Sequence, residues 1–118
     1  MAEEWKRARF GAVIEPVSTV IDLLQVPSGF TWHVNRAYYK RTSGPTGTIL
    51  FIRTDSANVE TERYLNQVVG AGSELGNMNE LTNLRGAVLT DQDKIRGSDS
   101  SATSSQVVLV LFVLERPT

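Results

Sequence analysis

The side chains that most often carry catalysis and metal binding are scarce in this sequence. The 118 residues include no cysteine and a single histidine, His33. Without cysteine these residues can form no disulfide, thiolate nucleophile, cysteine-ligated zinc site or iron–sulfur cluster. His33 would need an orienting carboxylate and a nucleophile to act as a general base, and the residues around it supply neither. We therefore expect no enzyme, no catalytic residue, no cofactor and no metal.

Two short segments carry weak metal or phosphate patterns. Residues 91–93, Asp-Gln-Asp, resemble half of a calcium loop. Lys94 follows them, however, and Ala102 stands at the twelfth position, where such a loop needs glutamate. The glycine-rich residues 70–73 lack the lysine and hydroxyl residue of a phosphate-binding loop. We interpret both segments as turns between strands.

Basic and aromatic residues are mixed within residues 32–41. The members are Trp32, Arg36, Tyr38, Tyr39, Lys40 and Arg41. Single-stranded nucleic acid is bound by such mixtures, but strand alternation places Trp32 and Tyr38 opposite Tyr39. The net charge of −1 also favours no nucleic-acid partner. The alternative that Trp32, Tyr38 and Tyr39 stack on a sugar stays open.

Most of the chain consists of short strand-like runs separated by turn residues. Apolar and β-branched runs at 17–26, 30–41 and 48–54 predict a three-strand meander, with Pro-Ser-Gly at 27–29 as its first turn. Residues 59–69 fit either a strand or a short helix. Further short strands are expected near 81–84 and 94–97, and 106–115 is expected to be the longest strand. Seven or eight strands with little helix predict an all-β protein, an antiparallel β-sandwich of jelly-roll type.

The last strand is apolar on both of its faces. One face carries Val107, Leu109, Leu111 and Val113, and the other carries Val108, Val110, Phe112 and Leu114. A half-solvated strand would have polar residues at every second position. We predict that a second subunit covers Val108, Val110, Phe112 and Leu114, as an oligomer interface. The alternative is that the N-terminal segment or a loop of the same chain covers them.

The first sixteen residues differ from the rest, because charges alternate with large aromatic side chains. We expect an N-terminal arm over residues 1–16 and the sandwich domain over 17–118. The arm would dock on a neighbouring subunit; the alternative is a terminus that folds back on its own sandwich. The residues expected to make this partner contact are Trp5, Lys6, Arg7, Arg9 and Phe10.

Neither a signal peptide nor a membrane helix is visible in the sequence. The N-terminus has charges where a signal peptide needs an apolar stretch, and the longest apolar run, 107–114, is far shorter than the roughly 20 residues of a membrane span. We expect a soluble protein that is made in a cytoplasm and has no membrane partner.

Several segments together resemble a group of small tailed-phage virion proteins with a β-sandwich core. The segments are 24–34 with its Val-Pro-Ser-Gly turn, 36–39, 88–97 with its Leu-Thr-Asp-Gln-Asp-Lys-Ile-Arg turn, the serine-rich 98–101, and 107–114. Gln92 stands where the pattern of this group has glycine. The resemblance extends over residues 17–115 and rests on turn motifs.

The resemblance implies a structural role without catalysis. Such proteins look like head decoration (cement) proteins, tail or fibre modules, or head–tail adaptors, commonly closed homo-oligomers such as trimers. We therefore expect a capsid decoration protein on the virion head surface, made in the host cytoplasm, whose partners are copies of itself and the major capsid protein. The alternative is a tail, fibre or glycan-binding module of the virion.

Overall fold

Strands make up nearly all of the regular structure of the chain. The computed structural model describes residues 6–14, 19–43, 47–69, 78–100 and 106–118. The elements in these ranges are β1 (Lys6–Ile14), β2 (Ile21–Gln25), β3 (Phe30–Ser43), β4 (Gly47–Thr54), β5 (Glu60–Val69), β6 (Met78–Glu80), the 3₁₀ turn η1 (Thr82–Leu84), β7 (Val88–Leu89), β8 (Lys94–Asp99) and β9 (Gln106–Pro117). Because the only helical element among them is η1, no described helix could cross a membrane.

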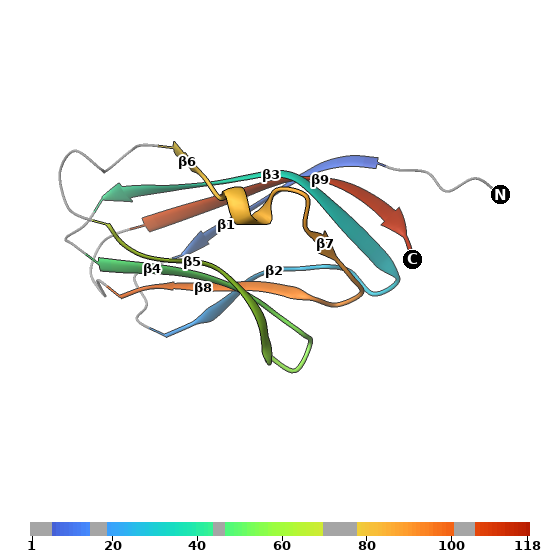
Figure 1. Cartoon of the computed structure of the whole chain (residues 1–118), viewed down its shortest axis with the longest axis horizontal. Coiled ribbons are helices and arrows are strands. Elements are labelled where there is room, and N and C mark those ends of the chain that lie inside the picture. Colours follow the sequence, from blue (N-terminus) through green and yellow to red (C-terminus); the bar gives the residue numbers. More distant parts are fainter. Residues whose placement is uncertain (1–5, 15–18, 44–46, 70–77, 101–105) are drawn as a thin grey trace.

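The strands pair as a nested series around the β4–β5 hairpin. β4 pairs with β5, β3 with β6 and β7, β2 with β8, and β1 with β9, all antiparallel. Two more pairings, β3 with β9 and β4 with β8, join these ladders into sheets. One sheet has the order β1-β9-β3-β6, with β7 also on β3, and the other has the order β2-β8-β4-β5. Figure 1 shows the two sheets as two layers that face each other.

The core lies between the layers and is filled from both. β9 contributes Leu109 and Leu111, and β4 contributes Ile49 and Phe51, all four fully buried. The rings of Phe51 and Tyr39 on β3 meet across the gap, with centroids 5.8 Å apart. This burial follows the period-2 alternation of the strands, so the expectation of an all-β protein with two antiparallel sheets is confirmed.

A buried ion pair also joins the two layers. Arg41 on β3 donates from Nε to Asp99 Oδ2 on β8 at 3.0 Å, and both side chains are 1% exposed. Removing such charges from water costs several kcal/mol per ion, about as much as the attraction returns. We therefore expect this pair to fix the alignment of the two layers rather than to raise the free energy of unfolding.

The order of the strands differs from the predicted meander. β2, β3 and β4 follow one another in sequence, yet β3 lies in one sheet while β2 and β4 lie in the other. Residues 26–29, which include the Pro-Ser-Gly turn, thus connect strands of different layers rather than neighbouring strands of one sheet. Residues 59–69, which fit either a strand or a short helix, contain the strand β5. Residues 82–84, expected within a short strand, form η1. The described residues hold nine strands, two of them only two or three residues long, where seven or eight were expected.

The two turns that carry the phage-protein resemblance touch each other. The backbone N–H of Val26 donates to Asp93 O at 2.9 Å, and that of Gly29 donates to Asp91 Oδ1 at 3.0 Å. Gln92 adopts a positive φ of 63°, a conformation that favours glycine. A glycine at position 92 would adopt this conformation without the strain of a side chain.

The segment expected to form an arm is instead part of the sheet over Lys6–Ile14. β1 pairs with β9 along its whole length, from Lys6 opposite Glu115 to Ile14 opposite Val107. Residues 1–5 and 15–18 lie outside the described residues, and with them the predicted contact residue Trp5. Residues 6–14 thus share a sheet with β9 and β3, and the division of the chain at residue 16 stays a prediction.

Candidate functional site

The outer face of the β1-β9-β3 layer combines an apolar stripe with basic residues. On β9, Val107, Leu109, Leu111 and Val113 point into the core and are at most 1% exposed. The alternate residues form the stripe, which consists of Val108, Val110, Phe112 and Leu114. Strand β9 therefore does have two apolar faces, one inside the core and one outside.

The neighbouring strands cover part of the apolar stripe. Val110 lies opposite Gly11 on β1 and Tyr38 on β3 and is only 6% exposed. Phe112 is 40% exposed, and the ring of Tyr38 meets its edge at a centroid distance of 6.2 Å. The same chain thus buries Val110, while Phe112 is the open part of the stripe.

Four cations surround the apolar stripe on this face. Arg7 lies opposite Leu114, Arg9 and Arg36 lie on either side of Phe112, and Lys40 lies opposite Val108. Residues directly opposite in an antiparallel pair share a face. The whole chain has a net charge of −1, so these four residues carry +4 and all the others together −5. The face is strongly basic on a protein that is slightly acidic.

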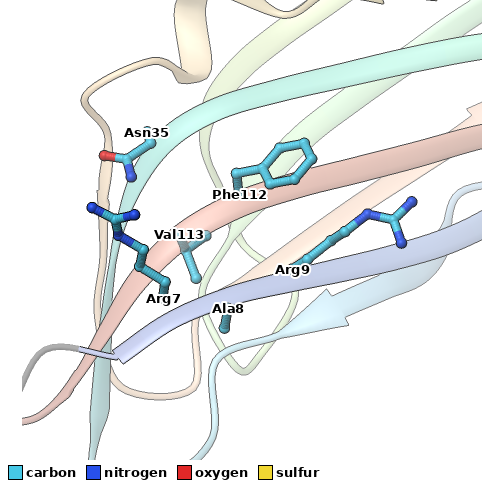
Figure 2. Close-up of a pocket in the computed structure, with 6 residues that line it drawn as sticks. All are labelled: Arg7, Ala8, Arg9, Asn35, Phe112 and Val113. Carbon is cyan, nitrogen blue, oxygen red and sulfur yellow. The ribbon is translucent and has the colours of Figure 1, made fainter.

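A shallow hollow opens at one end of this face. It has a volume of about 250 Å³ and is lined by Arg7, Ala8, Arg9, Asn35, Phe112 and Val113. Figure 2 shows Arg7 and Arg9 on β1 and Asn35 on β3, with Phe112 and Val113 on β9 between them. The charged groups thus form the rim of the hollow, and Phe112 is the exposed apolar side chain beside them.

A β-bulge in β3 places Asn35 at the rim. The pairing of β3 with β9 shifts between Val34 and Arg36, which leaves Asn35 as an extra residue. Both Asn35 and Arg36 are exposed, although alternation would send one of them to the core. Bulges commonly redirect a side chain in this way near functional sites. Sequence alternation alone does not reveal this residue.

The predicted partner-contact residues fall into two groups. Lys6, Arg7 and Arg9 are exposed. Phe10 points the other way: its ring stacks on the buried Trp32 at a centroid distance of 4.4 Å and an interplanar angle of 17°. The side chain of Phe10 thus packs against the core of its own chain, and its contact with a partner stays a prediction.

The predicted sugar-stacking platform is not formed. Trp32 is 2% and Tyr39 5% exposed, both inside the core. Trp32 Nε1 also donates to Glu115 Oε2 at 2.7 Å. Of the three aromatic residues, Tyr38 alone is accessible, and its hydroxyl accepts a hydrogen bond from Arg36 Nη1 at 3.2 Å.

Asp93 of the calcium-like segment is hydrogen-bonded within the turn and to a neighbouring strand. Asp93 Oδ2 accepts from the backbone N–H of Thr90 at 2.9 Å and from Arg53 Nη2 at 2.6 Å. The residues that the structure describes contain no group of three or more potential metal ligands.

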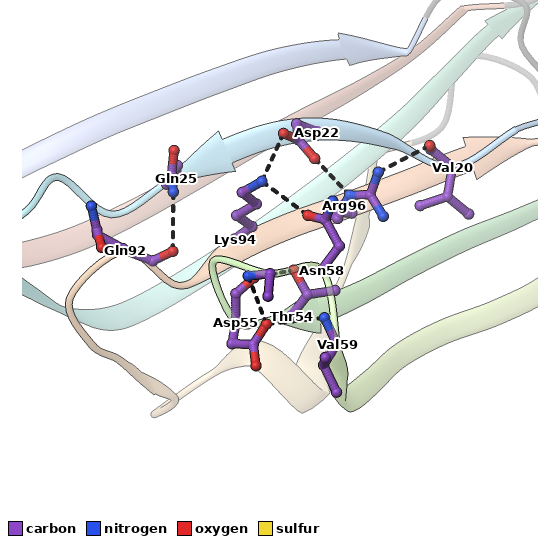
Figure 3. A network of polar contacts seen from close by, with 11 residues as sticks. Val20, Asp22, Gln25, Thr54, Asp55, Asn58, Val59, Gln92, Lys94 and Arg96 are labelled. Carbon is purple, nitrogen blue, oxygen red and sulfur yellow. Dashed lines mark hydrogen bonds and ion pairs between the residues drawn. The ribbon is translucent and has the colours of Figure 1, made fainter.

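A polar network lies on the opposite layer, at the outer face of β2 and β8. Asp22 accepts from Arg96 Nε at 2.6 Å and from Lys94 Nζ at 3.1 Å, and Lys94 also donates to Asn58 Oδ1 at 2.9 Å (Figure 3). The hydrogen bonds from Arg96 and Lys94 lower the pKa of Asp22 below its usual value. This network uses its cations internally, unlike the basic face of the other layer.

Comparisons with known proteins identify the fold without a family. No protein-family model matches the sequence, and no curated protein matches it significantly. Among solved structures, a chain from the disulfide-linked pili of Bacillus endospore appendages has a TM-score of 0.61 and 9% identity, covering 99% of this chain and 91% of that one. A chain from the acid-stable capsid of Helicobacter pylori bacteriophage KHP30 has a TM-score of 0.57 and 11% identity, covering 96% and 91%. The chain is thus similar in fold, over nearly its whole length, to a pilus subunit and to a phage capsid protein.

Proposed function

We propose that this chain is a non-enzymatic structural protein of a phage particle, specifically a capsid decoration protein that bridges major capsid subunits. The observation that carries the proposal is the basic face with the exposed Phe112 at its centre. Arginine and aromatic side chains are enriched where protein interfaces are buried. The fold similarity to a phage capsid chain and the turn motifs at 24–34 and 88–97 support this assignment.

We further infer that the two layers form a jelly roll. A jelly roll is a long antiparallel hairpin rolled into two sheets, with eight strand positions and two Greek keys. The nested pairing of β1 with β9, β2 with β8, β3 with β7 and β4 with β5 supports this topology. β6 and β7 both pair with β3 and would together fill one strand position.

The shell contact and the oligomer contact compete for one surface in this proposal. From the sequence, the shell contact was expected on the N-terminal arm and the oligomer contact on the outer face of β9. Arg7 and Arg9 instead lie beside Phe112. We assign this face to the neighbouring shell subunit. A homotrimer through Val108, Phe112 and Leu114 would need the same face, and light scattering distinguishes the two assignments: the shell assignment predicts 13.0 kDa for the free protein, and the trimer three times that mass.

The second candidate function is the subunit of a fibre or pilus. The similarity to the endospore pilus chain favours it. Because the sequence contains no cysteine, these residues could form no disulfide bonds in such a fibre. Electron microscopy of the concentrated protein tests this candidate, since regular filaments would support it over decoration.

An add-back assay tests decoration directly. Particles of the encoding phage that lack this protein are mixed with purified chain, sedimented and analysed for the number of bound copies per particle. We expect saturable, stoichiometric binding on the head surface, with weaker binding of Arg9→Gln and unchanged binding of the control Arg63→Gln. Arg63 is a suitable control because it is exposed on β5, in the other layer. Absence of saturable binding would reject the decoration function.

A further inference from the structure

We propose that the hollow between Arg7 and Arg9 is a binding site for an acidic protein segment. This segment would place a carboxylate beside each arginine and an apolar side chain against Phe112. The inference deepens the proposed function, on which its biological setting rests, by naming the chemistry of the partner surface. It stands on the charges, the shape and the lining of the hollow.

Arg7 and Arg9 differ from the other arginines of the described residues in having no internal partner. The pairs that occupy the others are Arg41 with Asp99, Arg53 with Asp93, Arg63 with Glu60, Arg85 with Glu80, and Arg96 with Asp22, while Arg36 donates to Tyr38 and Arg116 also has an interaction within the chain. For Arg7 and Arg9 no ion pair or hydrogen bond to another described residue is found. Their charges are thus available to an external anion.

The spacing of the two arginines suits an extended partner. Residues two apart on a strand point to the same face and lie about 6.6–7 Å apart. Alternate residues of an extended acidic segment have the same spacing, so two of its carboxylates can face Arg7 and Arg9 together. A guanidinium binds a carboxylate through two parallel N–H donors. The Asn35 amide on the far rim adds a donor and an acceptor for the backbone of the segment.

The apolar lining favours a protein over a nucleic acid. Phe112, which lines the hollow, is 40% exposed beside the two arginines. A side chain such as leucine would bury this surface. Nucleic-acid binding depends mainly on many cations that follow the phosphates, and a protein with a net charge of −1 offers little attraction outside this face.

Titration of the full chain with a defined peptide tests the site. The probe is a capped peptide of alternating glutamate and leucine, and its matched control has glutamine in place of glutamate. Chemical shifts of the isotope-labelled protein report which residues the peptide contacts. We expect shifts centred on Arg7, Arg9, Asn35 and Phe112, and binding that weakens with salt. Arg7→Gln and Arg9→Gln should each weaken binding about three- to tenfold, whereas Arg63→Gln should not.

Several outcomes would overturn the proposal. These are equal binding of the glutamine peptide, unchanged affinity in both arginine variants, shifts on the β2-β8-β4-β5 layer, or no shifts at millimolar peptide. Tighter binding of a single-stranded thymidine oligonucleotide would assign the face to nucleic acid. Concentration-dependent shifts of the same residues without peptide would assign it to a second copy of the chain.

The peptide titration and the particle assay fail independently. Arginine-dependent peptide binding with no binding to particles would leave the site standing and reject the decoration function. Particle binding that both Arg7→Gln and Arg9→Gln leave intact would support decoration and reject the site.

Discussion

Replacing Phe10 with alanine should destabilise the fold, because its ring packs against the core through the buried Trp32. Complete burial of a phenylalanine is typically worth about 3–5 kcal/mol on truncation to alanine, and Phe10 is only partly buried. Its stack on Trp32 adds about 0.5–1.5 kcal/mol beyond the buried area. We therefore expect Phe10→Ala to lower the free energy of unfolding by about 2–3 kcal/mol.

Urea unfolding followed by circular dichroism measures this loss. A domain of this size should also melt roughly 10 °C lower. Phe112→Ala is the matched control, since it makes the same substitution on the outer face, where the ring is 40% exposed and touches Tyr38 at its edge. We expect the control to lose about 1 kcal/mol or less. If Phe10→Ala is no more destabilising than Phe112→Ala, β1 does not pack as described.

Three further predictions concern the ion pair, a turn and the surface network. Asp99→Asn should lower the free energy of unfolding in urea by about 3–5 kcal/mol, because it leaves Arg41 buried without its charged partner. The double variant Arg41→Met with Asp99→Leu should recover most of this loss. An unchanged urea midpoint for Asp99→Asn would contradict the role of this ion pair. Gln92→Gly should stabilise the protein by about 0.5–1 kcal/mol because φ is positive there, and a lower midpoint would show that the turn differs. The Asp22 ion pairs should stabilise the fold above the ordinary carboxyl pKa of 3.8 and lose this effect as the pH falls through the lowered pKa of Asp22. The difference in stability between wild type and Asp22→Asn should therefore be present at neutral pH and vanish in strong acid, and a difference that persists there would refute the assignment.

Local patterns in the sequence predicted much of the strand content. Residues 30–41 and 106–115 lie within β3 and β9, and the turn at 27–29 lies between β2 and β3. Period-2 alternation identified which residues of β9 share a face. It could not identify the pairing partners, because those depend on contacts between residues far apart in sequence. This is why β2, β3 and β4 were predicted as neighbours although they alternate between layers.

Strand β1 was not predicted, although its sequence shows the alternation that is typical of a strand. Ala8 and Phe10 alternate with Arg7 and Arg9, which is the pattern of a half-buried strand. The aromatic residue among charges was read as an anchor instead. The hollow depends on the bulge at Asn35, a change in pairing register that alternation does not encode. The basic residues of the site were predicted, but the way they are brought together with Phe112 was not.

A cryo-electron microscopy reconstruction of particles saturated with this protein would show which layer of the chain faces the shell. We expect one ordered copy at each decoration site, with Arg7, Arg9 and Phe112 of the β1-β9-β3 layer against an acidic surface of a neighbouring shell subunit. Particles without the chain on their heads, or copies that face the shell through the β2-β8-β4-β5 layer, would contradict this expectation.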